Sequence, residues 1–201
     1  MVLLHSDICF DSERHVYSLG GMVLPSVSAV LSSAGLRTSY SNVPEPVLEK
    51  ARARGVAVHA YTESIDNGDD PVVEDPTHTG YVTAYRSFVR DSGYESIVSE
   101  IIVCHAELLY CGMPDAVGRL NERRTIVDRK ATAVLDKKGT AIQCGAYALA
   151  WDSMHADQPI EQIAGLHLKR DGSYQLVMFD IEEAKRVWLC AYEVYRFKRR
   201  K

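Results

Sequence analysis

Residues 112–130 read GMPDAVGRLNERRTIVDRK and decide how this chain folds. Two short runs of β-forming residues flank a polar break at 121–124, a pattern that predicts an antiparallel hairpin. With the turn centred midway along this break, Asp115 is expected opposite Lys130. Side chains alternate between the two faces of a strand, so Asp115, Asp128 and Lys130 share one face, with opposed Cβ atoms ~5 Å apart.

Two carboxylates and an ammonium gathered in this way suit a hard divalent cation. Mg²⁺ prefers oxygen ligands in near-octahedral geometry and usually takes one or two carboxylates from the protein. A coordinated water loses its proton more easily, and the metal offsets charge on phosphate oxygens. Lys130 stands two residues beyond Asp128 and could orient that water or neutralise the phosphate. The alternative is an ordinary exposed ion pair on an edge strand, because Asp-x-Lys alone is common.

The flanking sequence contains four patterns in a fixed order: Gly55-x-x-x-His59-x-x-x-Glu63, Gly112-x-x-Asp115, Asp128-x-Lys130 and Gln143-x-x-x-Tyr147. In this order they resemble the PD-(D/E)XK nuclease superfamily, specifically its RecB-like branch of small phage-type exonucleases. The resemblance extends loosely over nearly the whole chain. It implies an α/β fold, a single domain whose central mixed β-sheet is flanked by helices, as in restriction endonucleases.

The same resemblance implies a function and roles for the residues. The expected activity is a metal-dependent DNA exonuclease that hydrolyses phosphodiester bonds in DNA recombination or repair. Asp115 and Asp128 are expected to bind Mg²⁺ or Mn²⁺, with His59 contributing to the metal site. Lys130 is expected to position the attacking water.

Two pairs of residues spaced four apart have more than one interpretation. Glu63 shares a helix face with His59, so it either faces the metal or is a solvated helix residue. Gln143 and Tyr147 lie on a helix of small residues that can approach the sheet closely. The resemblance makes them active-site residues that orient the strand or support Lys130, whereas spacing alone also describes polar residues at a helix boundary.

Glu100 is the remaining candidate metal ligand, because related nucleases often carry a glutamate here that completes the acidic cluster. Pairing 96–104 with 108–116 places Glu100 opposite Gly112, on the face away from Asp115. A bulge at 113–114 would reverse that, since proline in a strand usually marks an edge or a bulge.

Candidate contacts to DNA are Ser26, Ser28, Arg54 and Arg129. Ser26 and Ser28 begin an expected helix, whose free amides can bind phosphate or be capped by serine. Arg129 occupies a position where relatives more often have an apolar residue, which predicts a partly solvated back of its strand. The basic tail 196–201 could contact phosphates or form a solvated helix end.

Length and composition fit one domain over residues 1–201, of which 46% are hydrophobic. We divide it into an N-terminal hairpin and helix at 1–35, a catalytic core at 45–155, and a C-terminal hairpin and helix at 163–201. Within these we expect helices at about 45–65, 79–92 and 181–195, and three strands between about 96 and 131. An aromatic stripe of Tyr81, Tyr85 and Phe88 is expected to pack in the core. The last helix is expected to bury Val187, Trp188, Ala191 and Val194.

The five cysteines are odd in number and scattered, which favours free thiols in a reducing cytosol. Cys144 and Cys190 are expected to be buried. The cysteine spacing excludes the four-cysteine set of the iron–sulfur relatives and a zinc site. The formal net charge is −4, to which an acidic metal cluster itself contributes.

Partners and compartment follow from motifs that are missing. The chain contains no phosphate-binding loop, so we expect no use of ATP and a separate helicase or annealing protein as partner of the DNA reaction. The start of the sequence lacks a leader, and no apolar run is long enough to span a membrane. We therefore expect a cytoplasmic protein, encoded by a phage or a bacterium, with its oligomeric state open. The alternative functions are an endonuclease of the same superfamily and a non-catalytic DNA-binding module that retains the fold.

Overall fold

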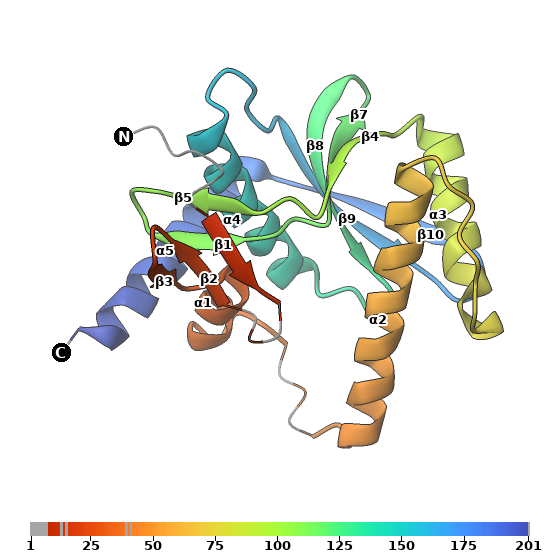
Figure 1. The fold of residues 1–201 in the computed structure, drawn as a ribbon, viewed down its shortest axis with the longest axis horizontal. Helices are drawn as coiled ribbons and strands as arrows, with labels where there is room; N and C mark the ends of the chain where they lie inside the picture. The colour runs from red at the N-terminus through yellow and green to blue at the C-terminus, as the bar shows by residue number, and fades with distance from the viewer. Residues whose placement is uncertain (1–7, 13, 15, 39, 41, 201) are drawn as a thin grey trace.

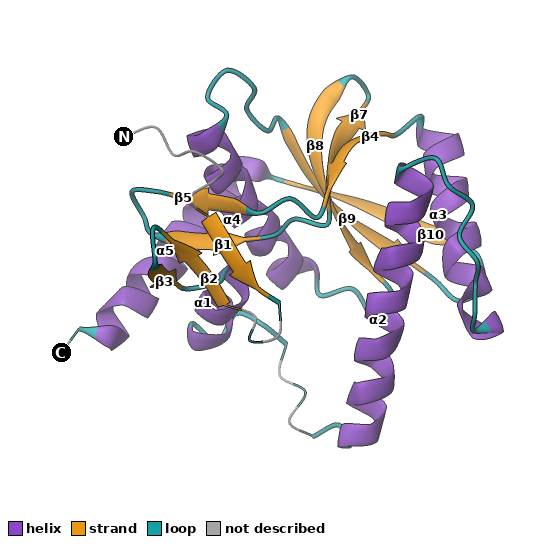
Figure 2. Ribbon diagram, viewed as in Figure 1, coloured by secondary structure: helices purple, strands orange, loops and turns teal. Residues whose placement is uncertain are grey.

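A five-stranded mixed β-sheet forms the centre of the protein, with helices on both faces (Figures 1 and 2). The computed structural model describes residues 8–12, 14, 16–38, 40 and 42–200. Along the sheet the strands follow the order β10 (Tyr174–Phe179), β9 (Gln162–Leu168), β8 (Arg123–Lys130), β7 (Ala116–Leu120) and β4 (Glu95–Ser99). The expected single α/β domain with a mixed sheet flanked by helices is confirmed.

The one parallel pair in this sheet, β8 with β9, explains the placement of α4 (Lys137–Met154). Parallel neighbours cannot be joined by a tight turn, so the chain crosses over through a helix. The buried residues of α4 are largely small, and among them Cys144 contacts β9 while Gly145 lies against α5, so the helix packs closely on both. Helices α5 (Ile181–Arg199) and α1 (Val27–Ser33) then pack on α4, with Trp188 at the centre of this layer.

Helices α2 (Glu45–Asp66) and α3 (Thr79–Ser92) cover the opposite face of the sheet, at the right of Figure 1. A short 3₁₀ turn, η2 (Pro76–His78), leads into α3. The stripe of Tyr81, Tyr85 and Phe88 on α3 is buried, as predicted. These rings pack against Val127 and Leu166 of the sheet, so the two faces of β8 contribute to two different cores.

Two small sheets complete the fold. Strands β1 (Ile8–Asp11), β2 (Val16–Leu19) and β3 (Met22–Leu24) form an antiparallel sheet, and β5 (Val103–His105) pairs with β6 (Tyr110–Gly112). The predicted N-terminal hairpin is confirmed for the described residues. The expectation of no leader concerns residues 1–7, which lie outside them. Within the described part, no helix is both long and apolar enough to cross a membrane.

The region from 95 to 130 contains five strands instead of the predicted three. The chain leaves the central sheet after Ser99, where Glu100 adopts a positive φ of 50°. It returns at β7, after Pro114, which has no amide hydrogen to donate to a ladder. The turn of the β7–β8 hairpin is Asn121-Glu122, both with positive φ, one residue earlier than predicted.

Three further expectations are wrong in the structure. Cys104 and Cys111 form a disulfide, because the pairing of β5 with β6 sets them directly opposite each other. Cys190 is exposed, whereas Cys144 is buried as predicted. Val194 of α5 is 45% exposed, because α5 turns Tyr192 and Tyr195 inward in its place.

The close approach of α4 to α5 gives a first testable prediction. A Cβ at Gly145 would lie 2.6 Å from the carbonyl carbon of Ala184 on α5. Gly145→Ala should therefore lower the free energy of unfolding by about 1–3 kcal/mol in urea denaturation, as overpacking does. Gly55→Ala is the matched control, because a Cβ there meets no atom within 4 Å and should stabilise α2 by up to about 1 kcal/mol. Equal effects of the two changes would contradict the packing described.

Candidate functional site

The candidate site lies at the edge of the central sheet where β4 and β8 end and β7 begins. Asp115 immediately precedes β7, and Glu100 immediately follows β4. The backbone N–H of Glu100 donates to the carbonyl of Asp115 at 3.1 Å. Ala116 pairs with Val127, which brings Asp115 level with Asp128 instead of Lys130. This shift of two residues preserves the side-chain alternation, so Asp115, Asp128 and Lys130 still belong to one site.

Asp128 is fully buried on the central strand β8 and pairs with Lys130. Its Oδ2 lies 2.6 Å from the Lys130 ammonium, and its Oδ1 has no hydrogen-bond partner among the described residues. Burial raises the pKa of Asp128 to about 6 even though the Lys130 charge opposes this. Burial also disfavours the charge on Lys130, but the carboxylates of Asp128 and Asp115 outweigh it and raise the pKa of the ammonium. An exposed pair on an edge strand is therefore excluded.

Asp115 is held by the neighbouring residue of β8 and by α2. Its Oδ2 accepts a hydrogen bond from the Arg129 N–H at 2.6 Å, and its Oδ1 lies 3.6 Å from His59 Nδ1. The other ring nitrogen of His59, Nε2, is 3.0 Å from the Arg129 carbonyl oxygen. The backbone of Arg129 thus orients both His59 and Asp115.

Glu100 faces the same space as Asp115, contrary to the predicted pairing with Gly112. The strand irregularity lies in β4, between Ser96 and Val98, and carries Glu100 to the position beside Asp115. Partial burial raises the pKa of the Glu100 carboxyl, and the negative charges of Glu63 and Asp115 add to this, while His59 lowers it. We call Glu63, Glu100, Asp115 and Asp128 the acidic cluster.

The donors of the acidic cluster fit a hard cation. They are carboxylate oxygens, which Mg²⁺ and Mn²⁺ prefer. Asp128 has a buried, unpartnered oxygen. The charge of Asp115 adds to the raised pKa of Asp128, and those of Glu63 and Asp115 add to the raised pKa of Glu100, a repulsion that a cation would relieve. As the side chains lie, no three His, Cys, Asp or Glu residues of the described chain converge closely enough to enclose a metal ion.

Arg129 points to the face opposite Asp128 and is only 2% exposed. Its guanidinium donates to Thr62 Oγ1 at 3.0 Å and to Asp66, and lies 4.8 Å from the centre of the Tyr85 ring. The Asp66 carboxylate also accepts hydrogen bonds from the hydroxyls of Tyr85 and Ser99. We call these five residues the Arg129 cluster. The prediction that Arg129 contacts DNA on a solvated strand is wrong, because α2 covers this face of β8.

Gln143 and Tyr147 lie on the side of α4 that faces the acidic cluster. The Gln143 amide donates to the Tyr147 hydroxyl at 2.8 Å. Tyr147 is buried, and its ring abuts Gly112, where a Cβ would lie 2.4 Å away. Burial raises the pKa of Tyr147, and the charges of Asp128 and Asp115 act on it in the same direction. The structure therefore brings both predicted α4 residues to the site.

The remaining candidate DNA contacts separate into two groups. Ser26 caps α1 by accepting a hydrogen bond from the Ala29 N–H at 3.1 Å, and Ser28 follows in the first turn. Arg54 lies on α2 and donates from Nε to the carbonyl of Ala131 at 2.9 Å, just beyond the end of β8. Only Arg54 is thereby linked to the segment that carries Lys130.

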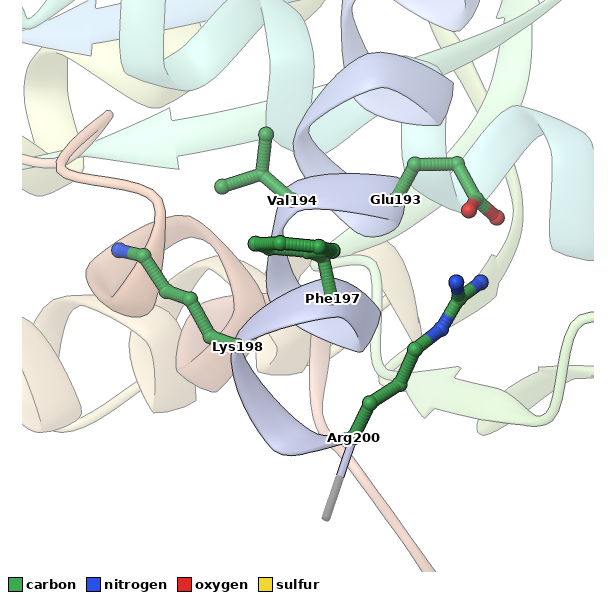
Figure 3. Close-up of a pocket in the computed structure, with 5 residues that line it drawn as sticks. All are labelled: Glu193, Val194, Phe197, Lys198 and Arg200. Carbon is green, nitrogen blue, oxygen red and sulfur yellow. The ribbon is translucent and has the colours of Figure 1, made fainter.

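The tail forms the end of α5, at the far left of Figure 1 and away from α2. Figure 3 shows the ring of Phe197 beside Val194, between Lys198 and Arg200. These residues, with Glu193, line a hollow of about 470 Å³, and Phe197 is exposed. Lys198 donates to the carbonyl of Ser33. The tail is thus an exposed helix end up to Arg199, and its contact with phosphates stays a prediction; Lys201 lies outside the described residues.

The solved structures that this chain resembles include two crystal structures of one exonuclease. No family model matches the chain, and no curated protein matches it. An alkaline exonuclease of Laribacter hongkongensis, LHK-Exo, is 13% identical over 87% of this chain and 91% of its own, with a TM-score of 0.33. LHK-Exo in complex with dAMP is 14% identical over 88% and 92%, with a TM-score of 0.31. A likeness of this strength assigns neither family nor function.

The Arg129 cluster yields a prediction about stability. Arg129→Met leaves the Asp66 carboxylate buried without its cation, which should lower the free energy of unfolding by about 3–5 kcal/mol. The double change Arg129→Met with Asp66→Leu should be less destabilising than the sum of the two single changes. Denaturant unfolding measures all three variants, with Arg123→Met at the exposed start of β8 as control. An Arg129→Met loss as small as that of the control would contradict the ion pair.

Proposed function

We propose that the protein is a divalent-metal-dependent deoxyribonuclease that hydrolyses phosphodiester bonds and acts as an exonuclease. The observation that supports this most is the meeting of Asp115, Asp128 and Lys130 at one sheet edge, with Glu100 and His59 beside them. The order of the four sequence patterns adds to it. We place the enzyme in DNA recombination or repair in a phage or bacterial cytoplasm, with a separate helicase or annealing protein.

Asp115 and Asp128 are the residues that would hold Mg²⁺ or Mn²⁺, with Glu100 and His59 completing the site. Bound there, the metal would make a water more acidic and offset charge that builds up on the phosphate oxygens. The unpartnered Oδ1 of Asp128 is one oxygen that is free for this role. The exposed position of Glu100 leaves it open to solvent and substrate.

The other residues position the reacting groups. The carboxylates of Asp128 and Asp115 raise the pKa of the Lys130 ammonium, which suits it as a hydrogen-bond donor and positive charge. In this role it would orient the attacking water and neutralise the phosphate. Gln143 and Tyr147 would position the strand or support Lys130 from α4. His59 is held between Asp115 and the backbone of Arg129. This would fix its ring beside the reacting phosphate.

The test is a titration with Mg²⁺ and Mn²⁺ on end-labelled linear duplex DNA, with covalently closed circular DNA in parallel. The proposal predicts loss of the linear DNA alone, and no cleavage in EDTA. Asp128→Asn and Lys130→Ala should each lower kcat about 10²–10³-fold, because each removes a charge that acts on the transition state. Asp91→Asn, an exposed carboxylate at the end of α3, is the matched control and should retain full activity.

Two other outcomes would decide between the remaining functions. Cutting of the circular DNA would assign the site to an endonuclease of the same superfamily. Absence of cleavage with either metal, on DNA that the protein binds, would favour a non-catalytic DNA-binding module.

A further inference from the structure

A second, basic hollow lies beyond the carboxyl ends of the parallel strands β8 and β9, the edge at which open α/β sheets commonly bind ligands. It has a volume of about 390 Å³. Five elements contribute to its wall: α2, α3, the segment after β8, the end of β9, and the β9–β10 turn. The polar residues that line it are Arg54, Thr132, His167, Lys169, Arg170 and Asp171.

The cations of this hollow are available to a ligand. Arg54 uses Nε to bind the Ala131 carbonyl, while its terminal amino groups donate to no described residue. Lys169 and Arg170 make no ion pair within the described part of the chain. The carboxylate in the wall, Asp171, instead accepts hydrogen bonds from the N–H and hydroxyl of Ser173 in its own turn. The hollow therefore carries an excess of positive charge.

The basic hollow lies next to the acidic cluster. His167 is the register partner of Lys130 on the neighbouring strand, and its Nε2 lies 2.7 Å from the Thr132 carbonyl oxygen. Thr132 follows Lys130 by two residues, and Arg54 precedes His59 by five on α2. The hollow and the acidic cluster thus adjoin each other on one edge of the sheet, with Lys130 between them.

We propose that the basic hollow binds a backbone phosphate of the DNA strand whose neighbouring phosphodiester lies at the acidic cluster. This rests on the proposed nuclease function and adds to it the path of the substrate. The acidic cluster by itself repels DNA, and the protein has a net charge of −4. The positive charges of Arg54, Lys169 and Arg170 would therefore supply the attraction that holds the DNA strand next to the acidic cluster. The guanidinium of Arg54 suits this role because it can donate two parallel hydrogen bonds to a phosphate.

The experiment measures binding of fluorescent duplex DNA in EDTA over a series of salt concentrations. The double variant Lys169→Gln with Arg170→Gln should bind DNA about tenfold or more weakly, with a shallower slope of log K against log salt by about 0.9 per lost contact. In turnover with Mg²⁺ its KM should rise while kcat stays within about twofold, because the lost contact is equal in ground and transition states. Arg54→Gln should behave similarly, and Arg54→Lys should recover much of the affinity.

The matched control is Arg186→Gln, an exposed arginine on α5 on the other side of the sheet. Affinity and salt slope equal to those of this control would overturn the assignment of the hollow. That result together with cleavage that needs Asp128 would leave the nuclease proposal standing. Weakened binding in the hollow variants of a protein that cuts no DNA would uphold the hollow and reject the nuclease.

Discussion

The buried ion pair between Asp66 of α2 and Arg129 of β8 is the contact on which the arrangement of the site depends. A charge in the core is tolerated only with a partner. Here Thr62 accepts from the guanidinium, Tyr85 and Ser99 donate to the Asp66 carboxylate, and the Tyr85 ring covers the guanidinium. One position of α2 meets all these contacts at once. In that position His59, two helical turns before Asp66, reaches Asp115.

The alternation of side chains along β8 connects the buried Asp66–Arg129 pair to the candidate site. Asp128 and Lys130 face α4, Gln143 and Tyr147, while Arg129 between them faces α2. Since the backbone of Arg129 also holds Asp115 and His59, a single residue joins the support on one face to the site on the other. The acidic cluster is left with repulsion that a cation would relieve, and the basic hollow next to it carries the opposite charge.

The sequence predicted the parts of the site that depend on local periodicity. Asp115, Asp128 and Lys130 were predicted to share one face of the hairpin. This holds although the turn was predicted one residue too late, because the resulting register shift of two residues leaves each side chain on the same face. Gln143 and Tyr147 were predicted as site residues from the resemblance, because their spacing alone also describes polar residues at a helix boundary. A signal for Asp66 was also present, since His59, Thr62 and Asp66 recur at helical spacing on one face of α2.

Features that arise from distant segments could not be predicted in this way. Burial of Arg129 requires knowing that α2 crosses that face of β8. The position of Glu100 depends on an irregularity in β4, and the disulfide depends on the register of β5 with β6. In the sequence, Lys169 and Arg170 indicate only a hairpin turn, and the fold places them in one hollow with Arg54. The most direct test of the metal assignment is anomalous diffraction from crystals grown with Mn²⁺. The assignment predicts an anomalous peak about 2 Å from carboxylate oxygens of both Asp115 and Asp128. No peak at the acidic cluster, with Lys130 still paired to Asp128, would contradict it.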